Sequence, residues 1–152
     1  MNRIIDFKDF ESGKFSISSG WIYCFNDGCK LKDVCLRWTT GMKKRDKLIW
    51  GNSVFPAAAE SDVCPMFVEM RKSTVAWGFS KALGNVRMAD VKAIRQAIVK
   101  TMSNRRDFTR YNSGEWKLSE NQQLTIRRIF AAYGYTDIEF DNYQVAISLS
   151  AK

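Results

Sequence analysis

Four cysteines in a chain without histidine limit the chemistry of this protein more than any other feature. The chain has 152 residues, and its cysteines are Cys24, Cys29, Cys35 and Cys64, in the spacing C-x4-C-x5-C-x28-C. Four thiolates suit a tetrahedral Zn²⁺ ion or an iron–sulfur cluster, and neither needs a histidine ligand. The turn sequence Asn26-Asp27-Gly28 lies between the first two cysteines and favours a loop that gathers ligands. The pattern therefore predicts one metal centre held by all four cysteines.

The spacing leaves the kind of site open. Zinc ribbons usually contain at least one C-x2-C, which this chain lacks. Iron–sulfur sites tolerate wider spacing, and Cys64-Pro65 resembles the end of a ferredoxin pattern. Cysteines also serve as buried apolar residues, or as disulfide and redox pairs. We favour a metal over these alternatives, and zinc over a cluster, because nothing in the sequence indicates an electron-transfer partner.

The absence of histidine also restricts catalysis. Histidine is the commonest general base, and both Ser–His–Asp hydrolases and Cys–His proteases require it. A carboxylate or lysine active site stays open, but no motif indicates one. The sequence therefore favours a module without enzymatic activity.

Length and patterning predict one soluble, cytoplasmic domain over residues 1–152. A chain of this length buries a core without disulfides. The charged start Met1–Asp6 is unlike a secretory signal, and no stretch approaches the roughly 20 apolar residues of a membrane helix. Cysteines kept inside a cell stay reduced and are available as metal ligands.

Positive charge is concentrated in two segments. The net charge is +8, and Lys30–Trp50 and Arg87–Arg110 each contain seven basic and two acidic residues. Such segments attract nucleic acid, although a basic face can also serve solubility alone, in a module that binds protein. The arginines predicted to contact phosphate are Arg105, Arg106 and Arg110, and the predicted second anchor is Lys43, Lys44 and Arg45. The five tryptophans are expected in the core around the metal site, and the alternative is that exposed rings stack on bases.

The periodicity predicts an α+β fold, with about three main helices and short antiparallel strands or hairpins around the four-cysteine metal site. The predicted main helices are Pro65–Leu83, Met88–Met102 and a helix capped by Ser119 that ends at Gly134. A shorter helix is predicted within Leu31–Trp38. The predicted strands and hairpins are Phe15–Ser18, Leu48–Phe55, Phe108–Leu118 and Ile138–Leu149.

The cysteines stand in short motifs that resemble a known family. These motifs are Cys24-Phe25-Asn26, Cys29, Cys35-Leu36-Arg37, Cys64-Pro65-Met66-Phe67 and Ala76-Trp77-Gly78. They resemble a family of small uncharacterised four-cysteine proteins from Bacteroidetes bacteria, over most of the chain. Lys30 and Met66 depart from the proline and tyrosine that are frequent in that family, but neither departure removes a ligand. The resemblance implies a shared fold and a bacterial cytoplasmic protein, and it implies no activity.

Overall fold

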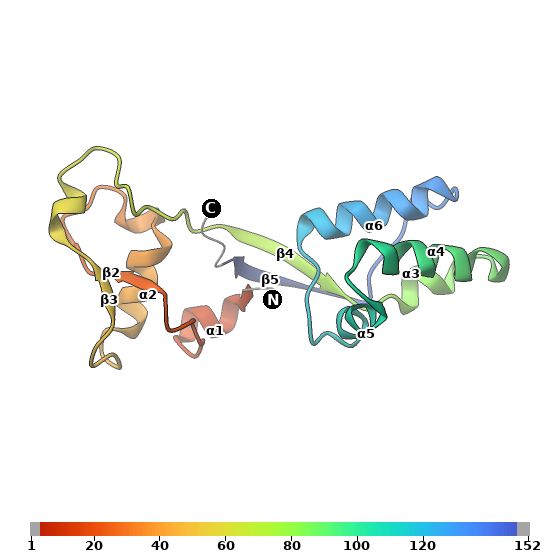
Figure 1. Ribbon diagram of the computed structural model, residues 1–152, viewed down its shortest axis with the longest axis horizontal. Helices are drawn as coiled ribbons and strands as arrows, with labels where there is room; N and C mark the ends of the chain where they lie inside the picture. Colours follow the sequence, from red (N-terminus) through yellow and green to blue (C-terminus); the bar gives the residue numbers. More distant parts are fainter. Residues whose placement is uncertain (1–3, 149–152) are drawn as a thin grey trace. The chain divides into compact units, whose positions relative to one another are not determined.

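The sequence divides into two compact units in the computed structural model, which describes residues 4–148 (Figure 1). One unit comprises residues 4–72 with 147–148, and the other comprises residues 73–146. The division falls inside strands β4 (Lys72–Trp77) and β5 (Asn142–Ser148). Strands β1 (Ile4–Asp6), β5 and β4 form a three-stranded sheet in that order. The prediction of a single domain over residues 1–152 stays a prediction.

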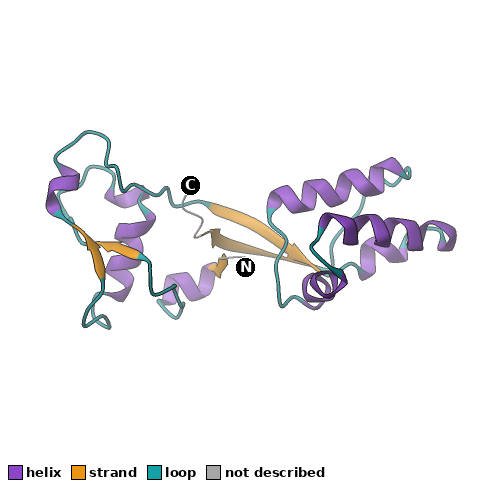
Figure 2. Cartoon of the chain, in the orientation of Figure 1, coloured by secondary structure: helices purple, strands orange, loops and turns teal. Residues whose placement is uncertain are grey.

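The unit that contains the cysteines is built on a short parallel strand pair. Strand β2 (Ile22–Cys24) pairs with β3 (Asn52–Val54), so that Cys24 lies opposite Val54. The helices of this unit are α1 (Phe7–Ser12), α2 (Leu36–Lys44) and two 3₁₀ turns, η1 (Lys32–Val34) and η2 (Pro56–Ala59). A small apolar core beside them includes Phe10, Phe15, Trp21 and Leu36. Irregular segments connect these short elements (Figure 2).

Helix α2 lies close to β2 at Gly41. A Cβ atom on Gly41 would lie 2.4 Å from the carbonyl oxygen of Cys24, which is closer than side-chain atoms approach a backbone oxygen. Only glycine therefore permits this approach, and the contact holds the helix against the strand that ends at Cys24.

We expect Gly41→Ala to lower the free energy of unfolding by about 1–3 kcal/mol, the usual cost of inserting a methyl group into a packed site. Denaturant unfolding measures this change. Gly20→Ala is the matched control, since a Cβ atom at Gly20 meets nothing within 4 Å. Equal stabilities of the two variants would contradict this account of the contact.

The second unit is mainly helical. Its helices are α3 (Ser80–Gly84), α4 (Met88–Thr101), α5 (Arg105–Ser113) and α6 (Glu120–Ala132). Ile94 and Ile98 on α4 and Ile126 and Phe130 on α6 are buried in one apolar core. Ser119 caps α6 in a capping box with Gln122, as the sequence predicts. Because Ile94 and Ile98 face this core, the opposite face of α4 is exposed to solvent.

The mixed α and β class is confirmed, but several predicted elements are wrong. The described residues form six α-helices, not about three, and β2 and β3 are parallel, not antiparallel. The predicted helix over Pro65–Leu83 is instead a turn, strand β4 and the short α3. The predicted strand at Phe15–Ser18 has no regular structure, and Leu48–Phe55 forms no hairpin, since β3 pairs with β2.

Two further hairpins were predicted in the second unit. The segment Phe108–Leu118 does not form one, because helix α5 occupies its first half. Of the predicted hairpin Ile138–Leu149, only β5 is a strand, and Leu149 lies outside the described residues. The helix predicted within Leu31–Trp38 is present as η1 followed by the start of α2, and the predicted Met88–Met102 is present as α4.

Candidate functional site

All four cysteines line one small cavity. Its volume is about 10 Å³, which is room for one water-sized particle. The cavity wall consists of the four thiols together with Asn26, Lys32, Arg37, Trp38, Val54, Ala59, Met66 and Phe67. Cys24 and Cys35 are buried, while Cys29 and Cys64 are half-buried. The cavity is therefore closed on its inner side by the first pair and reached from its outer side past the second.

The first three cysteines reach the cavity through short local structure. Cys24 ends β2, and the backbone N–H of Cys29 donates to the carbonyl oxygen of Asn26 at 3.1 Å, which closes the expected turn. Cys35 follows η1 and is the N-cap residue of α2. The helix predicted over Pro65–Leu83 would have placed Cys64 at a helix start, but in the structure the cysteine at a helix start is Cys35.

Cys64 reaches the same cavity through contacts made after it in the chain. The N–H of Phe67 donates to the carbonyl oxygen of Cys64, which forms a tight turn and not a helix start. The segment after this turn then pairs with the loop that carries the first three cysteines, through an antiparallel bridge between Cys35 and Glu69. Arg37 adds a clamp, since its guanidinium donates to the carbonyl oxygens of Met66 at 2.8 Å and Ile22 at 3.0 Å. One arginine therefore ties the Cys64 turn to the strand that carries Cys24.

The other three cysteines lie close enough to affect the ionisation of Cys24. Burial raises the pKa of the Cys24 thiol, the backbone N–H of Asn26 lowers it, and the charges of Cys35, Cys29 and Cys64 raise it further. Within residues 4–148, however, no three Cys, Asp or Glu side chains are already arranged as ligands of a metal ion. The four thiols therefore share a cavity but do not yet form a complete coordination shell.

Trp38 places a buried hydrogen-bond donor beside the cysteine cavity. The indole Nε1–H of Trp38 is buried and has no hydrogen-bond partner among the described residues, and Trp38 lines the cysteine cavity. A buried N–H without an acceptor is costly, and a cysteine sulfur that moved toward it on metal binding would lower that cost. Lys32, whose ammonium lies 5.5 Å from the centre of the Trp38 ring, and Arg37 add positive charge to the cavity wall. This donor set fits a negatively charged cluster of thiolates.

A second candidate site is a basic groove on the other unit. It has a volume of about 640 Å³ and is lined by Lys92, Arg95, Gln96, Val99, Lys100 and Arg105. These residues form one face of α4 together with the first residue of α5, and they are exposed apart from the half-buried Val99. The guanidinium of Arg95 lies 4.9 Å from the centre of the Phe108 ring, which holds it between the helices. Four cations and no carboxylate therefore line the groove, and no ion pair found in the described chain involves any of the four.

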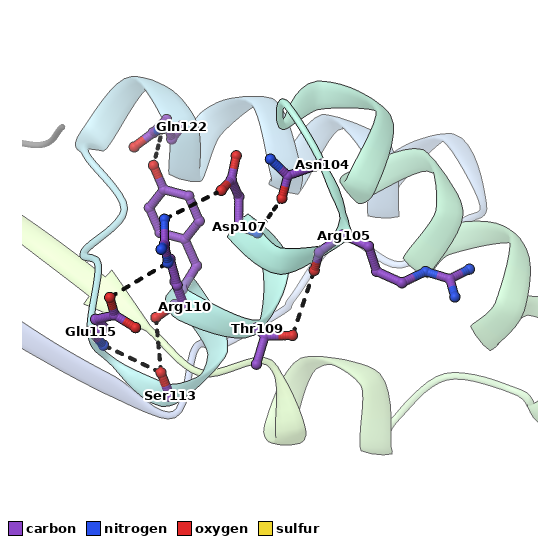
Figure 3. A network of polar contacts seen from close by, with 9 residues as sticks. Asn104, Arg105, Asp107, Thr109, Arg110, Ser113, Glu115 and Gln122 are labelled. Atoms are coloured by element: carbon purple, nitrogen blue, oxygen red, sulfur yellow. Dashed lines mark hydrogen bonds and ion pairs between the residues drawn. The ribbon is translucent and has the colours of Figure 1, made fainter.

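The predicted arginines of this unit have different surroundings (Figure 3). Arg105 points away from the polar network of α5 and lines the groove. Arg106 is exposed but lies outside the groove lining. Arg110 lies 3.9 Å from the Asp107 carboxylate, 3.5 Å from that of Glu115 and 4.6 Å from the Trp116 ring centre. These contacts occupy Arg110 within its own unit, so of the three only Arg105 lines the groove.

The second predicted anchor is tied to the backbone of the cysteine-containing unit. The ammonium of Lys44 donates to the carbonyl oxygens of Gly13 and Phe15, and its burial, followed by the charge of Lys47, lowers its pKa. Lys43 donates to the carbonyl oxygen of Glu11 at 3.2 Å. Arg45 forms an exposed ion pair with Asp46. Lys43 therefore holds the end of α1 against α2, Lys44 holds the segment after α1 there, and only Arg45 of the three is largely exposed.

Sequence reasoning missed Lys92, Arg95 and Lys100 as site residues. The signal was present, because these positions fall outside the apolar stripe of α4 and share the other side of the helix. What the sequence did not indicate was that α5 is a helix, and α5 supplies Arg105 and Phe108 to the groove.

Comparisons with known proteins give one match. The model of a family described as a family of unknown function (DUF6078) matches residues 5–148. No curated protein and no solved structure matches the chain. Within residues 4–148, none of the helices combines the length and the apolar character needed to cross a bilayer.

Proposed function

This chain belongs to that family of unknown function, DUF6078, and we propose that it is a zinc-stabilised module that binds the phosphate backbone of nucleic acid. One observation above all carries the binding proposal, which is the groove where Lys92, Arg95, Lys100 and Arg105 converge without a carboxylate. Cations that form no ion pair among the described residues are available for phosphate, and guanidinium groups match its oxygens in pairs.

The geometry of the groove supports a polyanion over a single small anion. Lys92 and Lys100 are eight residues apart on α4, which corresponds to about 12 Å along a helix axis. Consecutive nucleotides of one strand advance by about 3.4 Å along a duplex. The row of cations therefore extends over several successive phosphates. The proposed contacts are to phosphates, which carry no sequence information, so we expect binding without strong sequence preference.

The proposed zinc ligands are Cys24, Cys29, Cys35 and Cys64. Their common cavity has room for one small particle, which favours a single ion over an iron–sulfur cluster. Four thiolates around Zn²⁺ carry a net negative charge, and Lys32, Arg37 and the Trp38 N–H offset it. The ion would cross-link segments of irregular structure, so that binding energy becomes folding energy. Metal binding must draw the thiols inward, since the described side chains form no complete ligand set.

Free thiolates require a reducing compartment, and we propose that the protein works in a bacterial cytoplasm, as the family resemblance implies. No catalytic arrangement accompanies either candidate site, and a role without catalysis is part of the proposal.

Titration of mixed-sequence duplex DNA and duplex RNA into the purified protein tests the binding proposal. Four phosphate contacts give a slope of about −3.6 in a plot of log K against log salt for DNA. We expect a slope near that value and no dependence on sequence. Binding that is absent, or that does not change with salt, would overturn the proposal and favour a module that binds another protein.

We expect Trp38→Phe to weaken zinc binding by about 10-fold or more, the usual effect of losing a hydrogen bond to a metal ligand. The zinc-free variant should be no less stable than the zinc-free parent, because the N–H that is removed is buried there without a partner among the described residues. Competition with a chromogenic chelator and thermal melting measure the two quantities. Trp50→Phe is the control, since Trp50 is exposed and lies outside the cavity wall. A Trp38→Phe protein with the parent's zinc affinity would refute the proposed N–H to thiolate bond.

A further inference from the structure

An aromatic pocket lies on the cysteine-containing unit, apart from the cysteine cavity. Its volume is about 170 Å³, and its lining is Tyr23, Phe25, Arg45, Leu48, Ile49, Trp50, Gly51 and Asn52. Tyr23 and Cys24 are neighbours in β2, so their side chains project from opposite faces of the strand. Cys24 lines the cysteine cavity and Tyr23 lines the aromatic pocket, which are therefore two faces of one strand pair.

The pocket exposes apolar surface that packing does not explain. The side chains of Ile49 and Trp50 are 97% and 88% exposed, although both are large and apolar. They follow Arg45 and Lys47 in the loop between α2 and β3, and both of these cations are exposed. Large exposed apolar residues beside cations indicate a surface that is covered by a ligand.

The dimensions and the lining favour a flat ring beside a negative charge. A cavity of about 150 Å³ is known to hold a benzene ring, so a pocket of about 170 Å³ has room for one small ring system. The Tyr23 and Phe25 rings are stacked at 6.4 Å between centres, and Trp50 adds a third aromatic face. Arg45 lies in the lining, and its only ion pair in the described structure is an exposed contact of 3.7 Å with Asp46, which is easily exchanged.

From these observations we propose that this pocket binds an unpaired nucleobase of a single-stranded nucleic acid, with the base stacked on Trp50 and an adjacent phosphate on Arg45. The inference rests on the proposed function and deepens it, because it names the strand form. Bases in a duplex are stacked on each other and cannot enter such a pocket, whereas every unpaired base offers a face to an aromatic ring. The base fills the pocket and covers the exposed Trp50 ring, while Arg45 favours a charged strand over an apolar peptide.

The test compares a mixed-sequence single-stranded DNA oligonucleotide with the same sequence as a duplex. Removing one base–aromatic stacking interaction costs about 1–3 kcal/mol, so Trp50→Ala should weaken single-strand binding by about 5-fold to 150-fold. Its duplex affinity should equal that of the parent. Trp50→Phe should restore much of the single-strand affinity, and Phe55→Ala is the matched control. Phe55 is 79% exposed in the same unit but does not line the pocket.

Each outcome separates this inference from the groove proposal. If charge reversal in the groove has no effect but Trp50→Ala weakens single-strand binding, the groove proposal fails and the pocket stands. If Trp50→Ala leaves single-strand affinity unchanged, or lowers single-strand and duplex affinity equally, the pocket inference is overturned. If Phe55→Ala has the same effect as Trp50→Ala, the inference is also overturned, because exposed aromatic surface in general would explain the result.

Discussion

Replacing Cys29 with serine should remove zinc from the protein and lower its Tm by roughly 10 °C. Loss of a structural metal belongs to the class of changes that cost about 4 kcal/mol or more, and 1 kcal/mol corresponds to about 2–4 °C in a chain of this size. Cys29 is the better choice over Cys24 or Cys35, because those two are buried and a serine hydroxyl there would add its own cost. Elemental analysis of the purified protein and calorimetry provide the two measurements.

A chelator provides the control for this variant. If the effect of Cys29→Ser is the loss of zinc, a strong chelator should lower the Tm of the parent to the value of the variant, and it should leave the variant unchanged. A variant that retains one zinc per chain, or that loses zinc and melts like the parent, would contradict a structural zinc site. If the parent protein contains iron and absorbs visible light, the site holds an iron–sulfur cluster and not zinc.

The sequence predicts the location of the cysteine site better than the structure around it. The turn at Asn26-Asp27-Gly28 forms, since turn chemistry is local and depends on adjacent residues. The approach of Cys64 depends on the Cys35–Glu69 bridge and on the two hydrogen bonds of Arg37. These contacts join positions 15 to 34 residues apart in sequence, and no local pattern encodes them.

Helix prediction succeeds where a long stripe and a cap agree, and it fails where propensity meets tertiary contacts. Helix α4 follows its stripe, and α6 begins at its capping box. The segment Pro65–Leu83 has apolar residues at spacings that fit a helix, but β4 pairs within a sheet, and the sheet decides its structure. Gly78 has a φ of +85°, and a Cβ atom there would clash with Asp141, which is why a glycine ends β4.

The hairpin predicted at Phe108–Leu118 was wrong because its turn signal has another use. Asn112-Ser113-Gly114 ends helix α5, and Gly114 has the left-handed conformation of a C-cap. The side chain of Asn112 accepts a hydrogen bond from the N–H of Phe79. The same short sequence can form a β-turn or end a helix. Which of the two forms depends on tertiary contacts, such as the bond between Asn112 and Phe79.

Charge reversal in the basic groove should abolish most of the nucleic-acid affinity. The double variant Arg95→Glu, Arg105→Glu replaces two of the four cations by carboxylates, so that the groove lining has no net charge. At low salt we expect affinity for mixed-sequence duplex DNA to fall by about 100-fold or more, because counterion release supplies most of the free energy of such binding. The slope of log K against log salt should fall toward zero for the same reason.

The matched control is Arg106→Glu, Arg128→Glu, which has the same net charge as the groove variant. Both arginines are exposed and lie outside the groove lining, so this control measures the effect of overall charge alone. We expect it to retain most of the parent's affinity and slope. Equal losses in the two double variants would show that the charge of the whole protein, and not the groove, attracts nucleic acid.

Arg95 also contacts the Phe108 ring, so its replacement has a structural cost that needs a separate measurement. Melting of the groove variant shows whether its fold is intact. Lys92→Gln, Lys100→Gln provides a second variant that removes charge without touching Phe108. It should lower the magnitude of the salt slope by about 2, which is about one unit for each phosphate that the variant no longer neutralises. Two folded variants with parental affinity would end the groove proposal, whereas weaker binding by both, with the control unchanged, would place phosphate binding on α4.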